Sequence, residues 1–567
     1  MHDLVIRNGN VVDGTGAPAV AADIAIEGGR FTEVDRGGSG VGRGYREIDA
    51  GGELVAPGWV DIHTHYDGQA TWDPEMTPSS WHGVTTVVMG NCGVGFAPVR
   101  PGSREFLIEL MEGVEDIPGT ALHEGIEWEW ETFGEYLDAL EATPRVMDVA
   151  AQVPHAAVRA YVLGERAHED ATDDEIAEMA QVVKKALSEG AVGFSTSRTV
   201  LHRSRHGLVP GTRAPADELL AIGQGLAGAG PRVFEVVTDQ PELPEERGWM
   251  VELSRRTGAR VTYGLAQTPW NPTGYREALA DAAALNSEGV KIAPQVACRP
   301  TGMLFGLQST LHPFITHPHY VEIASLVLWE RVARLKDPET RSLLLAEEPS
   351  TDNQIAIALM SRFDQMFRLG DPPDYEPEPS SSVAATAARE ARSPQAVALD
   401  WLLEAGGKAL LFAPLASYVD ANHDAIREMI THGSTVLGLS DGGAHCGLIC
   451  DASMPTYLLT HWARDRRRGA RIGLEEAVAL QTSRTARAFG LGDRGCVSPG
   501  KRADLNIIAA DDLRLHPPEM VNDLPAGGRR LVQHVDGYLY TVVAGEVTFE
   551  NGAATGARPG RLVRASR

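Results

Sequence analysis

The chain has 567 residues, of which 43% are apolar, and a formal net charge of −26 with a pI near 5.1. This length predicts either several average domains or one large α/β barrel with insertions and a smaller domain. The negative charge argues against nucleic acid or an anionic membrane as a partner, because both bind basic surfaces. We therefore expect a small-molecule substrate as the partner, and homo-oligomer formation stays open.

The cysteines are few for a chain of this length. Their odd number and wide spacing do not fit a disulfide framework; they are Cys92, Cys298, Cys446, Cys450 and Cys496. The opening MHDLVIRNG lacks the basic and apolar stretches of a secretory signal, and no run of 18 apolar residues predicts a membrane helix. These features predict a cytoplasmic protein with free thiols.

Both ends of the chain have the pattern of short strands. DLVIRNGNVVDG and ADIAIEGGRFTEV alternate apolar and polar residues around Asn-Gly and Gly-Gly turns. ADLNIIAADDL and YLYTVVAGEVTFENGAATG repeat this pattern near the C-terminus. We expect residues 1–55 and 490–560 to pair into one small composite β-sandwich domain.

The middle of the chain, residues 56–489, alternates apolar runs with helical patterns. TDDEIAEMAQVVKKALSEG is such a helix, with Thr172 as N-cap and Gly190 as C-cap. Eight apolar runs with helices between them predict a parallel sheet, closed as a (β/α)₈ TIM barrel, with a doubly wound open sheet as the alternative. The runs are PGWVDIHTH, GVTTVVMGNCG, RVMDVAAQVPH, GAVGFSTSR, RVFEVVTD, RVTYGLAQT, VKIAPQVACRP and STVLGLSDGGAH.

A long insertion interrupts this pattern at about residues 300–430. The segment DPPDYEPEPSSSVAATAAREARS is rich in Pro, Ser and acidic residues, which is typical of a surface excursion. Barrels carry their functional groups on the loops after the strands, so an insertion on that face is expected to cover the site.

Two histidines end the first barrel-like strand, in PGWVDIHTHYD. His63 and His65 are two residues apart, so on a strand their side chains point to the same side. Two imidazoles placed in this way can converge on one metal ion. The alternative is that one of them caps a turn while the other packs in the core.

Several segments resemble one known family. PGWVDIHTHYD is similar to the first-strand motif of the metal-dependent amidohydrolase superfamily, in which both histidines bind metal. GVTTVVMGNCGVGFAPV, MEGVEDIPG, DVAAQVPHAAVR, GAVGFSTS and SPGKRADLNII resemble the N-acyl-D-amino-acid deacylase (D-aminoacylase) family, and together they cover most of the chain. STVLGLSDGGAH resembles that family's eighth-strand segment.

The resemblance implies a set of site residues. Cys92 of GNCG corresponds to the family's zinc-binding cysteine, and Asp441 to the aspartate that is both metal ligand and proton shuttle. Imidazole, thiolate and carboxylate are suitable zinc ligands, and bound Zn²⁺ lowers the pKa of its water to about 7. Asp441 then carries the proton to the leaving nitrogen, and His155 is a candidate donor to the oxyanion.

The chain departs from the family at the fifth and sixth strands. The family takes one histidine from the end of each for its tighter zinc, but RVFEVVTD and RVTYGLAQT contain none. Glu235 is the nearest replacement on the fifth strand, and the sixth offers only Gln267. We therefore predict one Zn²⁺ held by His63, His65, Cys92 and Asp441, with Glu235 as a further ligand, and we do not expect a second metal.

Three further residues are candidates for substrate binding. Arg198 and Arg299 follow the fourth and seventh strands, where either guanidinium could pair with a substrate carboxylate. A structural ion pair is the alternative for each. His445, four residues after Asp441, is a candidate for orienting the substrate.

These predictions support three hypotheses about function. The first is a metal-dependent hydrolase that cleaves a C–N amide bond of a small molecule, with an N-acyl amino acid as the best candidate. The second keeps the same site but acts on a cyclic amide or lactam, a lactone or a carbamate. The third is a degenerate barrel that binds a small molecule without catalysis, and the missing histidines motivate it.

Overall fold

The computed structural model describes residues 1–37, 40–239, 241 and 243–565. Its centre is an eight-stranded sheet in which all neighbouring strands run parallel. The strands follow one another in chain order across the sheet: β6 (Trp59–Asp61), β7 (Val84–Met89), β8 (Asp148–Pro154), β9 (Gly193–Arg198), β12 (Val233–Thr238), β13 (Arg260–Gly264), β14 (Ile292–Val296) and β18 (Val436–Leu437). This order has no reversal point, which excludes the doubly wound alternative.

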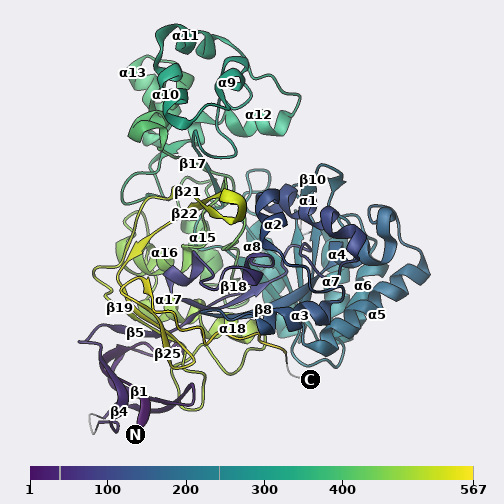
Figure 1. Cartoon of the computed structure of the whole chain (residues 1–567), viewed down its shortest axis with the longest axis vertical. Coiled ribbons are helices and arrows are strands. Elements are labelled where there is room, and N and C mark those ends of the chain that lie inside the picture. The colour runs from purple at the N-terminus through teal and green to yellow at the C-terminus, as the bar shows by residue number, and fades with distance from the viewer. Residues whose placement is uncertain (38–39, 240, 242, 566–567) are drawn as a thin grey trace.

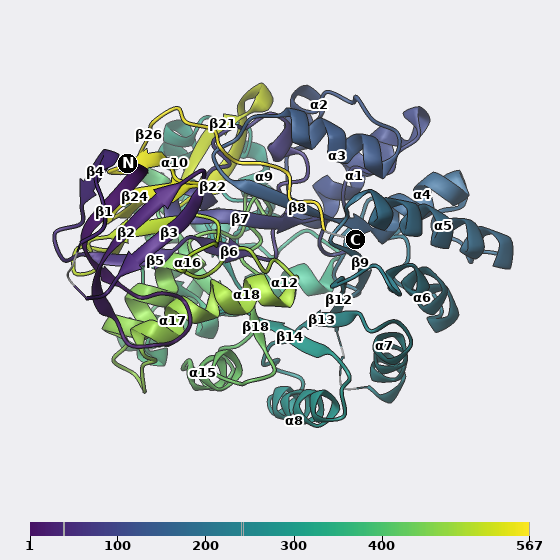
Figure 2. The same ribbon diagram turned by 90° about the horizontal axis from the view of Figure 1, so that it is seen from below.

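The sheet is curled, and helices cover its outer side (Figure 2). The protein is therefore an α/β fold built on a curled parallel sheet. The predicted helix with Thr172 as its N-cap is confirmed as α5, and a capping box starts it. The helices of this part of the chain are α1 (Arg104–Glu115), α2 (Gly119–Gly125), α3 (Phe133–Ala142), α4 (His155–Leu163), α5 (Asp173–Glu189), α6 (Ala216–Gly223), α7 (Pro244–Thr257), α8 (Gly274–Ser287), α15 (Asp424–Ile430), α17 (Leu474–Leu480) and α18 (Ser483–Ala488).

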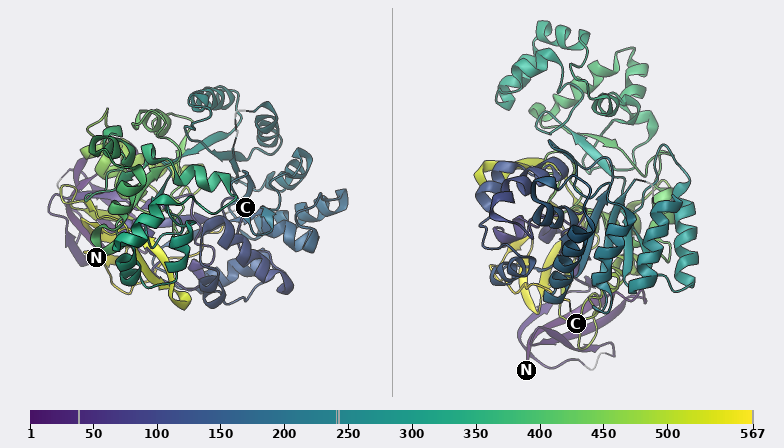
Figure 3. Two further views of the ribbon diagram at one scale, coloured as in Figure 1. Left: turned by 90° about the horizontal axis from the view of Figure 1, so that it is seen from above. Right: turned by 90° about the vertical axis from the view of Figure 1, so that its right-hand side faces the viewer.

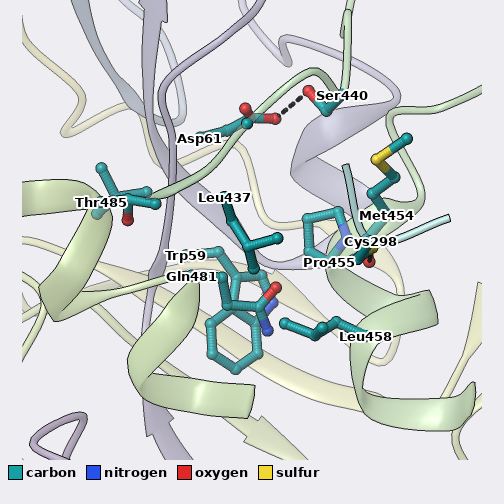
Figure 4. Close-up of a pocket in the computed structure, with 12 residues that line it drawn as sticks. Trp59, Asp61, Cys298, Leu437, Ser440, Met454, Pro455, Leu458, Gln481 and Thr485 are labelled. Carbon is teal, nitrogen blue, oxygen red and sulfur yellow. Dashed lines mark hydrogen bonds between the residues drawn. The ribbon is translucent and has the colours of Figure 1, made fainter. Parts of the chain in front are cut away.

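The loops that follow the first and last strands of this sheet are bonded to each other. The His65 amide donates to the Gly442 carbonyl at 2.8 Å, and the Asp441 amide donates to the His63 carbonyl at 3.1 Å. In the same two segments, the Ser440 hydroxyl donates to the Asp61 carboxylate (Figure 4). The two ends of the sheet are thus held together next to the HxH motif.

A cavity of about 40 Å³ lies between the first and last strands, where Figure 4 shows its lining. Trp59, Leu437 and Leu458 form much of its apolar wall, and Asp61 lies at its edge. Burial raises the pKa of Asp61 to about 6, although Ser440 opposes this shift. Small-molecule sites occupy roughly 300–1,000 Å³, so this cavity is too small to hold a substrate.

The two ends of the chain share a second, nine-stranded sheet. Its central pairing is antiparallel, between β5 (Leu54–Pro57) and β19 (Leu505–Ile508). The sheet has its own apolar core, while the sandwich arrangement and the domain boundaries stay predictions. The other strands are β1 (His2–Val11), β2 (Val20–Glu27), β3 (Arg30–Asp35), β4 (Gly44–Asp49), β24 (Tyr538–Val543), β25 (Glu546–Glu550) and β26 (Ala553–Ala554).

The insertion forms a mainly helical unit that projects from the rest of the molecule (Figures 1 and 3). It begins at β15 (Gly302–Phe305) and returns through β17 (Leu411–Pro414), which pair with each other. It has its own apolar core, whereas α15 packs back on β14. Its helices are α9 (Pro318–Ile323), α10 (Leu328–Lys336), α11 (Pro338–Ala346), α12 (Gln354–Met360), α13 (Val383–Glu390) and α14 (Pro394–Leu402).

The remaining elements are short. Among the described residues, no helix has the length and apolar character needed to cross a membrane. The short elements are β10 (Arg203–Ser204), β11 (Gly207–Leu208), β16 (Phe367–Arg368), β20 (Arg514–Leu515), β21 (Glu519–Leu524), β22 (Gly528–Val532), β23 (Val535–Asp536) and α16 (Met454–Tyr457), which a π-helical turn at Leu458–Asp465 follows.

Candidate metal centre

Four of the predicted metal ligands lie together at one end of the curled sheet. Cys92 Sγ is 3.3 Å from His63 Nε2 and 3.8 Å from His65 Nε2. One oxygen of Asp441 lies 3.4 Å from His63 Nε2 and 3.8 Å from His65 Nε2. Both imidazole side chains are 1% exposed and that of Asp441 is 18% exposed, so Asp441 is the member of the group that faces solvent most.

The GNCG turn after β7 places Cys92 in this group. Cys92 itself has a left-handed backbone, with φ of 57°, and Gly90 and Gly93 have φ of 76° and 70°. A Cβ at Gly93 would come within 2.8 Å of the Ser197 amide nitrogen, which explains the glycine there. The Gly93 amide donates to the Ser195 hydroxyl of β9 at 3.0 Å, so a neighbouring strand also fixes the turn.

The loop after β18 places Asp441. Asp441 has a left-handed backbone with φ of 48°, and its amide donates to the His63 carbonyl. Non-glycine residues rarely adopt this conformation, and structures that retain it do so because the surroundings hold it. The pairing of this loop with the HxH segment provides that support.

The hydrogen bonds of His63 define its tautomer. Gln295 uses its amide nitrogen to donate to Thr262 at 3.1 Å, so its oxygen is free to accept from His63 Nδ1 at 2.9 Å. With the proton on Nδ1, Nε2 carries the free lone pair and points toward Cys92. This arrangement prepares His63 Nε2 as a metal ligand.

Burial and charge shift the pKa values of the group in opposite directions. Burial lowers the pKa of His63 to about 4. Burial also disfavours a charged His65, but Glu115 and Asp441 outweigh it and raise that pKa to about 9. Burial alone would raise the pKa of Asp441, yet the two imidazoles lower it below its usual range.

The Cys92 thiol lies among carboxylates. Burial, followed by the charges of Glu115 and Glu235, raises the pKa of this thiol well above its usual value. A cation at this position favours the thiolate and opposes that shift. Two imidazoles, a thiol and a carboxylate are the ligand types that zinc prefers, so the residues present fit a zinc ion.

Glu235 lies beside the group of His63, His65 and Cys92, where it contacts the backbone of Cys92. One oxygen accepts a hydrogen bond from the Cys92 amide at 3.0 Å. The other is buried and has no hydrogen-bond partner among the described residues. Burial raises the pKa of Glu235 to about 8. Within the described part of the chain, the buried residues of this group whose possible metal-binding atoms all lie within 4.8 Å of one another are His63, His65 and Cys92.

His155 is in a different place from the one predicted. Its Nε2 pairs with Glu218 of α6 at 2.9 Å and its Nδ1 with Thr196 at 2.9 Å. Its ring also contacts Phe194, which lies two residues before Thr196 and therefore on the same face of β9. That face packs against the helices, and both ring nitrogens of His155 are engaged there. These contacts do not support the oxyanion role, which stays a prediction.

The two arginines predicted to bind substrate are engaged in structural ion pairs. Arg198 shares the helix-facing side of β9 with Thr196 and pairs with Glu246 of α7 at 2.6 Å. Arg299 is 1% exposed and pairs with Asp451 at 2.6 Å. The alternative raised from the sequence, a structural ion pair, describes both arginines, and neither presents a free guanidinium to a substrate.

His445 does lie beside the metal group. Its Nε2 is 3.9 Å from Asp441 Oδ2 and 3.5 Å from Glu115 Oε2, and its side chain is 21% exposed. The loop between β9 and β10 contributes a further imidazole: His202 Nδ1 bonds the Ser197 hydroxyl at 3.0 Å. Burial, followed by the charge of His445, lowers the pKa of His202 to about 3.

Sequence reasoning missed Glu115, Gln295 and His202 as members of the site. Glu115 lies in MEGVEDIPG, which shows family resemblance but no spacing typical of a ligand. Gln295 is on β14, where its inward direction is visible only once the strand's register is known. His202 follows β9 by four residues, and its direction depends on an irregular loop.

The chain is similar to several known proteins. The model of the Amidohydrolase family matches residues 46–549. D-aminoacylase from Alcaligenes xylosoxydans xylosoxydans is 33% identical over 228 residues, which are 40% of this chain and 43% of that protein. The alignment therefore spans less than half of that relative. N-acyl-D-glutamate deacylase from the same organism is 26% identical over 99% of this chain and 96% of that protein.

Among solved structures, a D-aminoacylase described with a binuclear metal centre, one-metal activation and second-metal attenuation has a TM-score of 0.66. It is 23% identical, with full coverage of both chains. Since the family model covers most of the sequence, the chain belongs to the Amidohydrolase family.

Proposed function

We propose that this protein is a zinc-dependent amidohydrolase that cleaves the amide bond of an N-acylated amino acid or a related small amide. The observation that carries the proposal is the convergence of His63, His65, Cys92 and Asp441 from three distant segments. The D-aminoacylase and N-acyl-D-glutamate deacylase relatives support this substrate class.

In this proposal the four residues hold one Zn²⁺, and Glu235 is a further ligand through its unpartnered oxygen. Bound zinc supplies Lewis acidity, which lowers the pKa of a coordinated water and polarises an amide carbonyl. Strands β13 and β14 direct Thr262 and Gln295 to the site, and these two side chains bond each other. The described β13 and β14 contain no histidine, cysteine, aspartate or glutamate that could bind a second metal. This supports a single metal.

The chain's own groups then perform the proton transfers. Asp441 is the most exposed carboxylate of the group, so it accepts a proton from the attacking water and returns it to the leaving nitrogen. His63 and His65 are buried and stay fixed. His445 lies 3.9 Å from the second oxygen of Asp441, where it orients that carboxylate toward the substrate.

The proposal also includes the full architecture predicted from the sequence. The bonds between the His63–His65 segment and the Asp441–Gly442 segment support closure of the curled sheet into a (β/α)₈ barrel. The β5–β19 pairing supports a composite domain of residues 1–55 and 490–560 beside a barrel of residues 56–489. A cytoplasmic location is supported by the five free cysteines.

Metal analysis tests the proposal. The purified chain reconstituted with zinc is expected to hold close to one zinc per chain, and His63→Ala is expected to lose both the zinc and the hydrolysis of N-acyl amino acids. His123→Ala is the matched control, because that exposed histidine lies on α2 and pairs with Glu105. Zinc below about 0.3 per chain, with hydrolysis unaffected by chelators, contradicts the proposal.

A second candidate substrate class is favoured by the positions of the two arginines. Arg198 and Arg299 are engaged by Glu246 and Asp451, so neither offers a guanidinium to a substrate carboxylate. This observation favours an uncharged substrate such as a cyclic amide, a lactone or a carbamate. A panel of N-acyl amino acids, their uncharged amides and cyclic amides separates the classes. Turnover of cyclic amides without any turnover of N-acyl amino acids would support this second class and reject the first.

A further inference from the structure

The last residue of α1 is a buried carboxylate that has no part in the function proposed so far. Glu115 is 1% exposed, although it ends a helix whose neighbouring acidic residue Glu112 is exposed. Burying a carboxylate is costly unless other groups compensate it. Its surroundings therefore indicate why it is there.

The two oxygens of Glu115 face two different imidazoles. Oε1 lies 3.5 Å from His65 Nδ1, and Oε2 lies 3.5 Å from His445 Nε2. Within the described part of the chain, Glu115 Oε1 and His65 Nδ1 are both buried without a hydrogen-bond partner. An acceptor and a potential donor that lack other partners thus face each other.

The backbone around Glu115 is fixed against the loop after β18. The Glu115 carbonyl accepts a hydrogen bond from the His445 amide. Asp116, with a left-handed φ of 52°, ends the helix, and its carboxylate accepts from the Gly447 amide at 3.0 Å. These bonds tie the end of α1 to the segment that carries Asp441 and His445.

We propose that Glu115 is a positioning residue that orients His65 for metal binding and holds His445 beside Asp441. It fixes His65 with Nδ1 toward the carboxylate, so that Nε2 points to Cys92 and Asp441. A carboxylate partner of this kind fixes the tautomer and the ring orientation of a ligating imidazole and makes it a stronger ligand. The inference rests on the proposed function, because it requires His65 to bind the metal.

The two metal-binding imidazoles then have different partners. His63 donates from Nδ1 to the neutral oxygen of Gln295, whereas His65 faces the charged carboxylate of Glu115. The substitution Glu115→Gln gives His65 the same type of partner as His63 and keeps the shape of the side chain. It therefore isolates the contribution of the charge.

The test is the zinc affinity of the full chain, measured by competition with a chromophoric chelator. Losing such a partner is expected to weaken zinc binding by about 10- to 100-fold in Glu115→Gln. Glu112→Gln is the matched control: it is on the same helix, is exposed, and its carboxylate accepts from the Gly119 amide at 3.0 Å. Its zinc affinity is expected to stay within about twofold of the unaltered chain, a change near 0.4 kcal/mol. Glu115→Asp keeps the charge and is expected to recover part of the affinity.

The outcomes separate this inference from the proposed function. An unaltered chain that binds no zinc overturns both. Normal zinc affinity in Glu115→Gln, even with a lowered melting temperature, overturns this inference alone and leaves Glu115 a structural residue. If Glu115→Gln does not fold, a crystal structure of the zinc-loaded unaltered chain decides. A His65 Nδ1–Glu115 Oε1 distance of about 2.7–3.0 Å supports the inference, and a distance beyond 3.5 Å overturns it.

Discussion

Left-handed backbone conformations gather at the residues of the metal centre. Cys92, Asp441 and His445 have φ of 57°, 48° and 52°, and none of them is glycine. Each such residue costs on the order of 1–3 kcal/mol, so the surrounding hydrogen bonds must hold it in place. This conformation turns the side chains of two separate loops toward the same pair of imidazoles.

Gly93 allows one of these loops to approach β9 closely. In Gly93→Ala, the new Cβ meets the Ser197 nitrogen at 2.8 Å and the Thr196 Cα at 2.9 Å, and both are backbone atoms. The residue also has a φ of 70°. We expect a loss of about 2–4 kcal/mol in the free energy of unfolding and weaker zinc binding, because the turn that carries Cys92 moves.

Urea unfolding and zinc titration check this prediction. Gly102→Ala is the control, because a Cβ at Gly102 meets nothing within 4 Å. It is expected to change the free energy of unfolding by less than about 0.5 kcal/mol. If Gly93→Ala is as stable as Gly102→Ala and has unchanged zinc affinity, Gly93 does not lie as close to the backbone of β9 as described.

Single residues differ in how well the sequence predicts them. The spacing of His63 and His65 is enough to predict that both side chains point to the same side of the strand, because alternate residues of a strand share one face. His155 and Arg198 were assigned to the site since each stands at the end of a strand. Their side chains point to the helix layer instead, and the sequence does not show which of two adjacent residues faces inward.

At the scale of elements, helices α4 and α6 are joined by a buried charged group. Glu218 of α6 accepts from His155 and from Arg159, both on α4. Burial alone would raise the pKa of Glu218, but His155 and Arg159 outweigh burial and lower it to about 2. Because this pKa is below that of the unfolded chain, the ionised Glu218 stabilises the fold.

Glu218→Gln tests this connection through its pH dependence. A carboxylate with a lowered pKa contributes stability above the pKa of the unfolded chain, about 4.3, and loses it as the pH falls toward 2. We therefore expect the variant to be less stable by on the order of 3 kcal/mol at pH 7, and the difference to shrink between pH 5 and pH 3.

Urea unfolding at pH 7, 5, 4 and 3 measures this difference. Glu404→Gln is the control, because Glu404 forms an exposed pair with Arg368 and is expected to contribute less than about 1 kcal/mol. A difference between Glu218→Gln and the unaltered chain that does not change with pH would show that Glu218 is not ionised in the fold.

The sequence predicts the presence of strands and helices better than the residues at which they begin and end. Each of the eight apolar runs contains a strand of the parallel sheet, because buried strands need continuous apolar segments. The eighth is reduced to Val436–Leu437, since the rest of its run forms the loop that carries Asp441. The insertion returns at Leu411–Pro414, earlier than its predicted end near residue 430, because α15 packs on the sheet.

Among the described residues, the largest apolar clusters of the molecule belong to the curled sheet, the insertion and the terminal sheet. Similar alternating patterns at the two ends of the sequence predicted that these ends would meet. The register of their contact, with Leu505 opposite Pro57 and Ile508 opposite Leu54, depends on the packing of the whole terminal sheet. A pattern of residues does not contain that information.

The pairing of Leu54–Pro57 with Leu505–Ile508 affects how the protein is made. During synthesis, the opening strands leave the ribosome long before the strand that will lie beside them exists. An exposed strand edge can pair with wrong strands, so the edge of Leu54–Pro57 stays open to misassociation until Leu505–Ile508 has been made.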